Sequence, residues 1–351
     1  MILITLIMKR LFNILFFLGI FHLGFSQETS PKKAKESEAP QAPGVETKTL
    51  TKDNVKLDAN TKESSDNLEY RSREVELKVK APNSFDYQYL KYINSPAEDK
   101  DYAALSNAYK VAPNNKEVQF EMTKYYELSN DIFNKRELCK KLNISLSSSL
   151  KEYAYNVLMS VEENGILITY GEDDTYPIWI LQELENLRKD VKVLNYDLLI
   201  NPNYRKEQQD KLGIKLSKKY RNNIDILKDI ATKNPNKKVY YSLTVSHLIL
   251  KQLKANLYST GLALKYSELQ YSNTTVLKSN WENSFKKEAL KKEIKNNVDS
   301  KIEMNYLLAL VQLSKYYKTN NLSKKYEEVK QLALSIAKRN GKESQVTKLF
   351  N

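Results

Sequence analysis

Three consecutive acidic residues occur in the segment GEDDT, residues 171–175, directly after the apolar run of residues 166–170. We expect the apolar run to be a β-strand, because it is short, nearly continuous and bounded by Gly165 and Gly171. In open α/β sheets, ligands bind beyond the carboxyl ends of the strands, so this acidic loop is the leading candidate site. Its carboxylates can bind a divalent cation, with Asp173 and Asp174 as candidate ligands, or act as a general base.

The favoured interpretation of the acidic loop is nevertheless structural. Asp174 or Thr175 is well placed to cap the helix that follows, with Pro177 in its first turn, and acidic residues are favoured at helix N-termini. The loop does not fit an aspartyl-phosphate phosphatase, which follows its strand with Asp-x-Asp-x-Thr. Aligning that Thr on Thr175 places Gly171 where the nucleophilic Asp belongs.

Two more predicted strands end at the same edge of the sheet. Asn195, Tyr196 and Asp197 end the second strand, and His247 follows the third. For His247 the alternative is a place at a helix N-terminus or in the core. The candidate ligand-binding residues are therefore Glu172, Asp173, Asp174, Thr175, Asn195, Asp197 and His247.

The elements that must position these residues form a small α/β layer. Strands are expected at residues 166–170, 191–196 and 238–244, with a helix around Trp179 between the first two and a helix over 220–232 before the third. A strand, a crossover helix and a strand of these lengths give parallel pairing. Residues 262–266 are expected to add an edge strand, and Trp179 is expected in the core.

Helical spacing dominates the flanks of this layer. It covers residues 86–163, punctuated at Pro113, and returns from Trp281 to the end, where a hairpin turns at residues 319–321. The spacing of Ala108 and Pro113 resembles the junction of two tetratricopeptide repeats. The predicted fold class is α/β within a mostly α chain, a small parallel βαβ-type sheet flanked by tetratricopeptide-like (TPR-like) helical hairpins.

The N-terminus reads as an export signal. Residues 1–26 contain no acid, one basic pair and an apolar run over 11–25, which is typical of a signal peptide cleaved near Ser26-Gln27. Residues 27–84 are rich in Lys, Glu, Ser, Thr and Pro and predict a disordered linker, within which 73–79 alternate in a strand-like way. The predicted domains are 1–26 signal peptide, 27–84 linker, 85–163 helical, 164–270 α/β and 271–351 helical.

The composition argues against catalysis. Cys139 is the only cysteine, so neither an intramolecular disulfide nor a thiolate-rich zinc site can form, and the eight glycines lack the spacing of a phosphate-binding loop. Cys139 lies in a helical pattern with Ile132, Phe133, Leu138 and Leu142, so we expect a small core residue rather than a nucleophile. No cofactor is predicted apart from the divalent cation that the acidic loop can bind.

The positive charge indicates what kind of partner to expect. Removing residues 1–26 takes away Lys9 and Arg10 and no acid, so the formal charge falls from +13 to +11. The excess is spread over Lys pairs, which favours a solvated surface over a nucleic-acid patch. We expect an envelope protein or an anionic glycan as partner, no nucleic acid, and no transmembrane anchor after signal cleavage; the oligomeric state stays open.

The central segment also resembles a known family. Residues 164–183, 188–195, 236–245 and 257–262 are similar to phrases in the soluble tails of Gram-negative membrane proteins of the domain of unknown function 2723 family, which is related to protein O-mannosyltransferases. This sequence has Glu172 where the family tends to have Asp, and Asp173 where Asn is frequent. The resemblance implies a free-standing accessory tail without the membrane-spanning portion in which glycosyl transfer would reside.

These observations favour an exported, non-catalytic binding or scaffolding protein of the periplasm or the extracellular space. The alternative is a carbohydrate- or metal-binding protein, or a glycan-related enzyme, that uses residues 172–174.

Overall fold

The computed structural model describes residues 65–97, 99–217, 219–220, 224–245, 247–292 and 296–350. The predicted signal peptide and most of the predicted linker, residues 1–64, lie outside the described residues. The described residues fall into two compact units, one formed by residues 65–122 and the other by residues 123–350. Each unit is considered separately.

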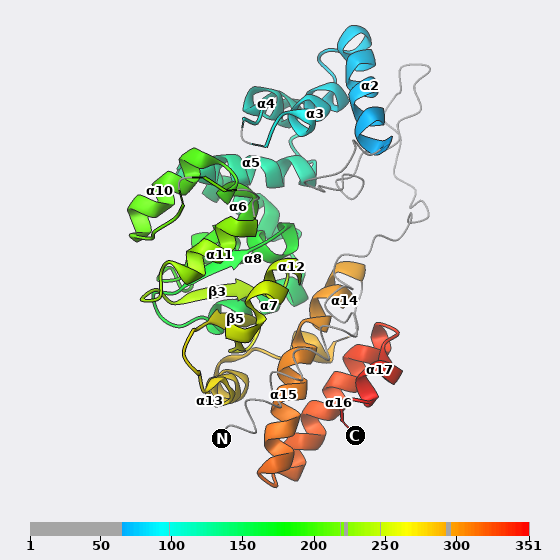
Figure 1. The fold of residues 1–351 in the computed structure, drawn as a ribbon. Helices are drawn as coiled ribbons and strands as arrows, with labels where there is room; N and C mark the ends of the chain where they lie inside the picture. The colour runs from blue at the N-terminus through cyan, green and yellow to red at the C-terminus, as the bar shows by residue number, and fades with distance from the viewer. Residues whose placement is uncertain are drawn as a thin grey trace. The chain divides into compact units, whose positions relative to one another are not determined.

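The first unit is helical. Its elements are α2 (Ser65–Lys80), α3 (Phe85–Asn94), α4 (Tyr102–Val111) and the first part of α5 (Lys116–Leu128), the remainder of which belongs to the second unit (Figure 1). Its core contains stacked aromatic rings, with Phe85 and Tyr89 5.5 Å apart and Tyr89 and Tyr92 6.3 Å apart between centroids. Helices therefore occupy 85–122, as the spacing predicts.

Helix α2 shows that the predicted linker extends too far. Residues 65–80, including the strand-like alternation at 73–79, are helical. Tertiary contacts with α3 explain the difference: Tyr70 is buried, the Asn94 side-chain amide donates to Glu74 Oε2 at 2.7 Å, and Arg73 lies 3.8 Å from Asp86. These contacts offset the ordering cost that the polar composition alone would not cover.

The second unit contains the sheet, together with helices that precede and follow the strands in the sequence. Before and within the sheet lie α6 (Ile132–Ile144), α7 (Ser148–Met159), β1 (Ile166–Thr169), α8 (Glu172–Glu185), β2 (Lys192–Asn195), α9 (Tyr196–Leu199), α10 (Pro202–Leu212), α11 (Ile224–Thr232), β3 (Val239–Ser242), α12 (His247–Leu253), β4 (Leu257–Ser259) and β5 (Ala263–Tyr266). After it come α13 (Asn273–Ser279), a π-helical turn (Asn280–Ser284), α14 (Asn297–Met304), α15 (Tyr306–Thr319), α16 (Ser323–Arg339) and α17 (Glu343–Thr347).

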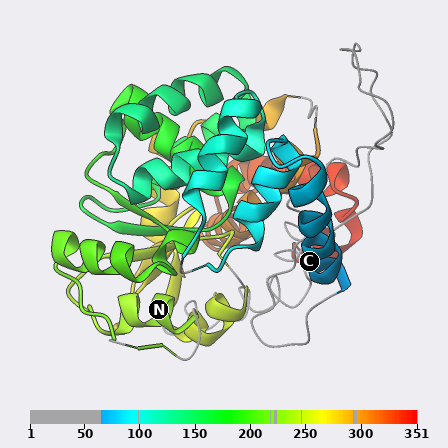
Figure 2. The same cartoon turned by 90° about the horizontal axis from the view of Figure 1, so that it is seen from above.

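The described strands form one five-stranded mixed sheet in the order β2-β1-β3-β5-β4. Strands β3 and β5 are labelled in Figure 1, and Figure 2 shows the same ribbon from above. The three predicted strands pair in parallel, with Ile168 opposite Leu194 on β2 and Tyr241 on β3. The segment predicted as an edge strand is instead β5, which pairs antiparallel with both β3 and β4. Its residues Ala263 and Leu264 are fully buried, which suits a strand with a neighbour on each side, and β4 forms the edge.

The connections place helices on both faces of the parallel strands. Helix α8 links β1 to β2, whereas α9 to α11 lead from β2 back across β1 to β3. Because such crossovers are right-handed, connections that run in opposite directions lie on opposite faces. Trp179 on α8 is buried as predicted, and α8 packs against α6 and α7.

The predicted C-terminal hairpin is confirmed by α15 and α16 (Figure 1). The chain reverses at Asn321, whose φ is 55°, and the Leu322 amide donates to the Tyr317 carbonyl oxygen at 2.9 Å. The fold class is therefore confirmed: a small α/β layer within a mostly helical chain.

Candidate functional site

Helix α8 begins earlier than the capping prediction requires. Its first residue is Glu172 and its N-cap is Gly171, so the prediction that Asp174 or Thr175 caps it is wrong, and Pro177 lies inside the helix rather than in its first turn. Gly171 has φ 78°, a conformation that glycine adopts without strain and that turns the chain sharply from β1 into α8. The acids of the loop occupy the first turn, where the helix dipole favours negative charge.

Asp174 is the most constrained residue of the loop. It is only 2% exposed, and its Oδ2 accepts hydrogen bonds from Ser242 Oγ at 2.6 Å and from the Tyr170 amide at 3.2 Å. Its Oδ1 is buried and has no hydrogen-bond partner. Burial raises the pKa of Asp174 to about 6, although hydrogen bonds from Ser242, Thr244 and the Tyr170 amide act in the opposite direction. Asp174 thus ties α8 to the ends of β1 and β3.

Thr175 and Asn195 form a second buried group at this edge. Thr175 Oγ1 donates to Thr169 Oγ1 at 2.9 Å and accepts from the Asn195 side-chain amide at 3.0 Å. Asn195 Oδ1 accepts from the Leu198 amide at 3.2 Å and so caps α9. These hydrogen bonds hold the ends of β1 and β2 to the helices that follow, which is a structural role for both predicted site residues.

The remaining predicted site residues are Glu172, Asp173, Asp197 and His247. Glu172 is half-buried and Asp173 is exposed. Asp197 Oδ2 lies 3.8 Å from Lys124 Nζ near the end of α5. His247 is the first residue of α12, which follows β3 as predicted, and its side chain is outside the described part of the structure.

Sequence reasoning missed Ser242 and Thr244. The two hydroxyl oxygens are 2.8 Å apart, and Thr244 Oγ1 is 3.4 Å from the Tyr170 carbonyl oxygen. The signal that would have found them is topological, because they end the third parallel strand at the same edge as the acidic loop.

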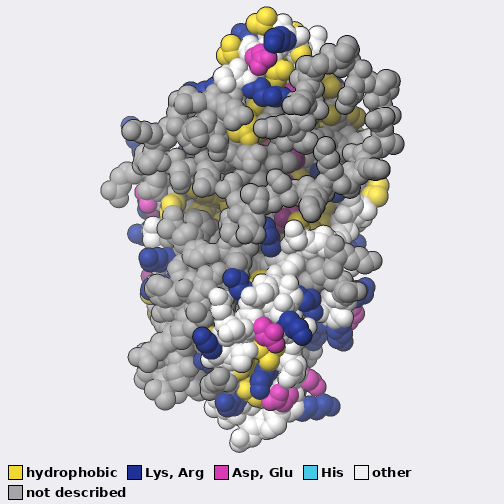
Figure 3. All heavy atoms as spheres, turned by 90° about the vertical axis from the view of Figure 1, so that its right-hand side faces the viewer, with side chains coloured by type: hydrophobic (Ala, Val, Ile, Leu, Met, Phe, Trp, Pro, Cys, Tyr) yellow, Lys and Arg dark blue, Asp and Glu magenta, His cyan; other side chains and the backbone are white. Residues whose placement is uncertain are grey.

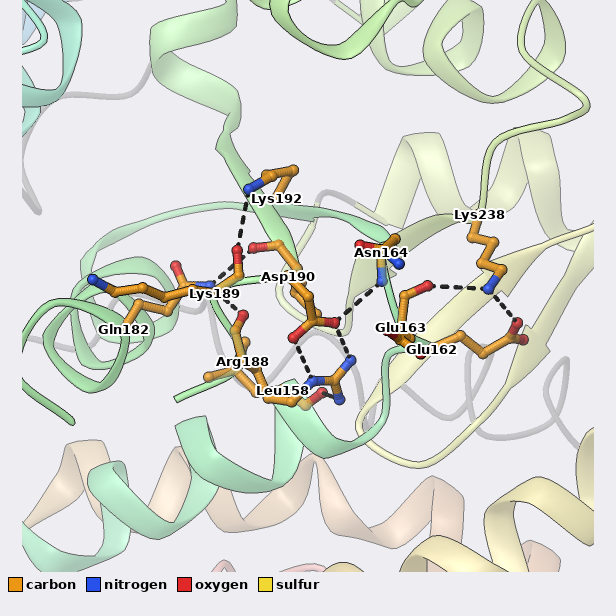
Figure 4. Close-up of polar contacts among 11 residues, drawn as sticks. Leu158, Glu162, Glu163, Asn164, Gln182, Arg188, Lys189, Asp190, Lys192 and Lys238 are labelled. Atoms are coloured by element: carbon orange, nitrogen blue, oxygen red, sulfur yellow. Dashed lines mark hydrogen bonds and ion pairs between the residues drawn. The ribbon is translucent and has the colours of Figure 1, made fainter. Parts of the chain in front are cut away.

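The opposite edge of the sheet carries a different polar network, shown in Figure 4. Arg188 Nε and Nη2 donate to the two carboxylate oxygens of Asp190 at 3.0 and 2.9 Å, and Arg188 Nη1 donates to the Leu158 carbonyl oxygen at 3.0 Å. Asp190 Oδ2 also accepts from the Asn164 amide at 3.1 Å. The Arg188 hydrogen bonds lower the pKa of Asp190 to about 2. This clamp fixes the start of β2 against the end of α7.

Glu162 is the centre of the neighbouring ion pairs (Figure 4). Its Oε1 accepts from Lys265 Nζ on β5 and, at 2.9 Å, from Tyr271 Oη, and its Oε2 lies 3.7 Å from Lys238 Nζ. Burial alone would raise the pKa of Glu162, but these hydrogen bonds outweigh burial and lower it to about 2. The hydrogen bonds and ion pairs of both networks stabilise this edge of the sheet.

Part of the α/β layer matches a known family. A family model for TMEM260-associated domain 2 matches residues 150–213. The matched segment runs from α7 to the end of α10 and includes Asp174, Thr175, Asn195 and Asp197, whereas Ser242 and Thr244 lie beyond it. No curated protein and no solved structure matches the chain.

A second candidate surface lies on α6. Ile132, Phe133 and Ile144 are exposed, Phe133 by 73% and Ile144 by 88%, so the prediction that Ile132 and Phe133 share the apolar side of Cys139 is wrong. Cys139 itself is buried as predicted, and burial raises its pKa to about 12.

The opposite side of α6 is firmly packed. Leu138, Cys139 and Leu142 are buried, and Lys135 Nζ reaches Glu127 at 2.7 Å and Glu183 of α8 at 3.2 Å. The same Lys135 Nζ lies 4.7 Å from the centroid of the Trp179 ring. Helix α6 is therefore anchored on α8, with Phe133 and Ile144 exposed on its outer side.

The charged surface of the C-terminal helices is mixed. In the lower half of Figure 3, Lys and Arg side chains stand among Asp and Glu rather than in one continuous patch. Lys325, from one of the Lys pairs, lies 2.8 Å from Glu282, and Lys330 lies 3.6 Å from Glu327. Within the described ranges, no group of three or more His, Cys, Asp or Glu side chains is placed to hold a metal ion. No helix in that part of the chain is long and apolar enough to cross a bilayer.

Proposed function

We propose that the chain is an exported, non-catalytic scaffolding protein of the cell envelope that binds another protein through the outer side of α6. The observation that carries this proposal is the exposure of Phe133 and Ile144 on a helix whose other side is already packed. At 100° per residue the two side chains project within about 20° of each other, and their eleven-residue separation spans about 16 Å.

This arrangement has the energetic character of a binding surface. Burying a large apolar side chain contributes about 1.5–3 kcal/mol, so Phe133, Ile144 and the adjacent Ile132 offer several kcal/mol to a partner that covers them. Glu137 and Lys140, which form a 2.6 Å ion pair on the same side, supply polar contacts between the two apolar ends.

The carboxyl edge of the sheet supports binding over catalysis. Thr175 and Asn195 at this edge are engaged in the hydrogen bonds that join strands to helices. Away from the edge, Cys139 on α6 is a buried thiol with a raised pKa. A carbohydrate-binding or glycan-related enzymatic role at residues 172–174 is the second candidate. It is favoured by Asp174 Oδ1, a buried oxygen at this edge that has no hydrogen-bond partner.

The proposal also includes export by a signal peptide and an accessory role that follows from the family likeness. The apolar run at residues 11–25 supports a cleaved signal peptide, and the match over residues 150–213 supports an accessory, tail-like module of the kind found in the domain of unknown function 2723 family. Mass spectrometry of the protein from a Gram-negative periplasm should find a mature chain that begins at Gln27. A membrane-bound chain that retains residues 1–26 would contradict export in soluble form.

The binding proposal is tested by capture from envelope extract with matched variants. Phe133→Asp combined with Ile144→Asp places charge on the outer side of α6, and Leu269→Asp is the control, because Leu269 is 79% exposed and follows β5. We expect the wild type and Leu269→Asp to retain the same partner and the α6 double variant to lose it. Equal capture by all three proteins contradicts the role of α6, and capture that disappears only at raised salt indicates an anionic glycan instead.

A further inference from the structure

The buried carboxylate of Asp174 lies at a distinctive point of the sheet. Strand β1 lies between β2 and β3. The chain runs from β1 to β2 on one side, returns across β1 to β3 on the other side, and then enters α12. The gap between the carboxyl ends of β1 and β3 is thus the topological switch point, where open α/β sheets bind their ligands. Asp174 Oδ2 contacts groups from both strands.

Oxygen atoms are concentrated at this point. Asp174 Oδ2 is 2.6 Å from Ser242 Oγ, Ser242 Oγ is 2.8 Å from Thr244 Oγ1, and Thr244 Oγ1 is 3.4 Å from the Tyr170 carbonyl oxygen. Ligand oxygens 2.0–2.1 Å from an octahedral Mg²⁺ lie about 3 Å from one another, so Thr244 Oγ1 and the Tyr170 carbonyl oxygen would move slightly closer together to bind one cation. A carboxylate, two hydroxyls and a carbonyl are all hard oxygen ligands.

Asp174 Oδ1 is the independent observation that points to a ligand. It is buried without a hydrogen-bond partner, and the groups that bond to the carboxylate in the described residues are the hydroxyls of Ser242 and Thr244 and the Tyr170 amide, with no ammonium or guanidinium group among them. A positive partner stabilises a buried carboxylate because it balances the charge that burial removes from water. A cation would supply that partner and satisfy Oδ1.

We propose that the switch point between β1 and β3 is a Mg²⁺-type divalent cation site, with Asp174 Oδ1 as the charged ligand and Thr244 Oγ1 and the Tyr170 carbonyl oxygen as neutral ligands. Ser242 holds the carboxylate in place by donating to Oδ2. Mg²⁺ is commonly bound through one or two carboxylates together with waters, so one protein carboxylate suffices. The inference concerns the sheet and is independent of partner binding by α6.

The site is tested by thermal unfolding of the full mature chain after EDTA treatment and dialysis, with MgCl₂ or CaCl₂ added at constant ionic strength. We expect a saturable rise in Tm for the wild type, no rise for Asp174→Asn, and an apparent Kd about tenfold weaker for Thr244→Val. Asp210→Asn removes an exposed carboxylate on α10 and should behave as the wild type.

Two results overturn the cation site. One is a wild type without a saturable rise in Tm, and the other is a rise that Asp174→Asn and Thr244→Val leave unchanged. If Asp174→Asn does not fold, Thr244→Val still decides, because it keeps the carboxylate and removes one oxygen ligand. The Phe133→Asp and Ile144→Asp double variant should retain the Mg²⁺ response, so failure of the α6 proposal and failure of this one are distinguishable.

Discussion

Glu162 should govern part of the acid sensitivity of the sheet. The pKa of Glu162 falls from 4.5 to about 2 in the folded protein, where Lys265 and Tyr271 bond to its carboxylate. Each pKa unit corresponds to about 1.4 kcal/mol, which would give roughly 3 kcal/mol for a fully shielded group. The Glu162 side chain is 32% exposed, so solvent screening reduces the expected contribution to about 1–2 kcal/mol.

The pH window follows from the direction of the pKa shift. Because the folded pKa lies below the unfolded pKa, the contribution of Glu162 is fully present above about pH 4.5 and is lost as the pH falls toward 2. Glu162→Gln should therefore lose about 1–2 kcal/mol at pH 7 and less at pH 2.5. Urea unfolding at pH 7, 5, 4, 3 and 2.5 measures both values.

Glu163→Gln is the matched control for this experiment. Glu163 is adjacent and exposed, and it accepts from Lys238 Nζ through its main-chain oxygen, which the substitution retains (Figure 4). The control should follow the wild-type pH profile. If Glu162→Gln and Glu163→Gln show the same stability at every pH, the ion-pair account of this edge is refuted.

Two further predictions concern packing. Gly261→Ala should lower the free energy of unfolding by about 2–3 kcal/mol, because a Cβ there would lie 2.5 Å from Ser160 Oγ and 2.6 Å from Phe285 Cζ. Gly341→Ala is the control, since a Cβ there would meet nothing within 4 Å, and equilibrium unfolding should show a clearly smaller loss of stability. Equal losses would refute the close approach at Gly261. Cys139 should react with a thiol reagent at the rate of unfolding rather than at the rate of an exposed thiol, since it is buried and its pKa is about 12, and rapid labelling of the native protein would contradict its core position.

Apolar patterning made the α/β layer predictable. The short runs that became β1, β2 and β3 are bounded by glycine or polar residues, and each is paired at its expected position. Antiparallel pairing of β5 was not predictable from its run of apolar residues, because that run looks the same at an edge and in the interior of a sheet. The helix at 65–80 depends on contacts with α3 that no local pattern contains.

The candidate site was predictable in place but not in detail. The acidic loop does lie at the carboxyl edge of the sheet, yet the glycine N-cap moves the helix start to Glu172 and buries Asp174. Ser242 and Thr244 could not be joined to it without the strand order. For Phe133 the signal was present, because at 100° per residue it projects away from Leu138 and Leu142.

The central claim, that the outer side of α6 binds another protein, is tested most directly by site-specific photo-crosslinking in a Gram-negative periplasm. A photoreactive residue would replace Phe133, Ile144 or, as the control, Leu269, which is exposed but lies outside α6. The account predicts one common protein adduct from positions 133 and 144 and none from position 269. No adduct from either α6 position, or the same adduct from position 269, would contradict it.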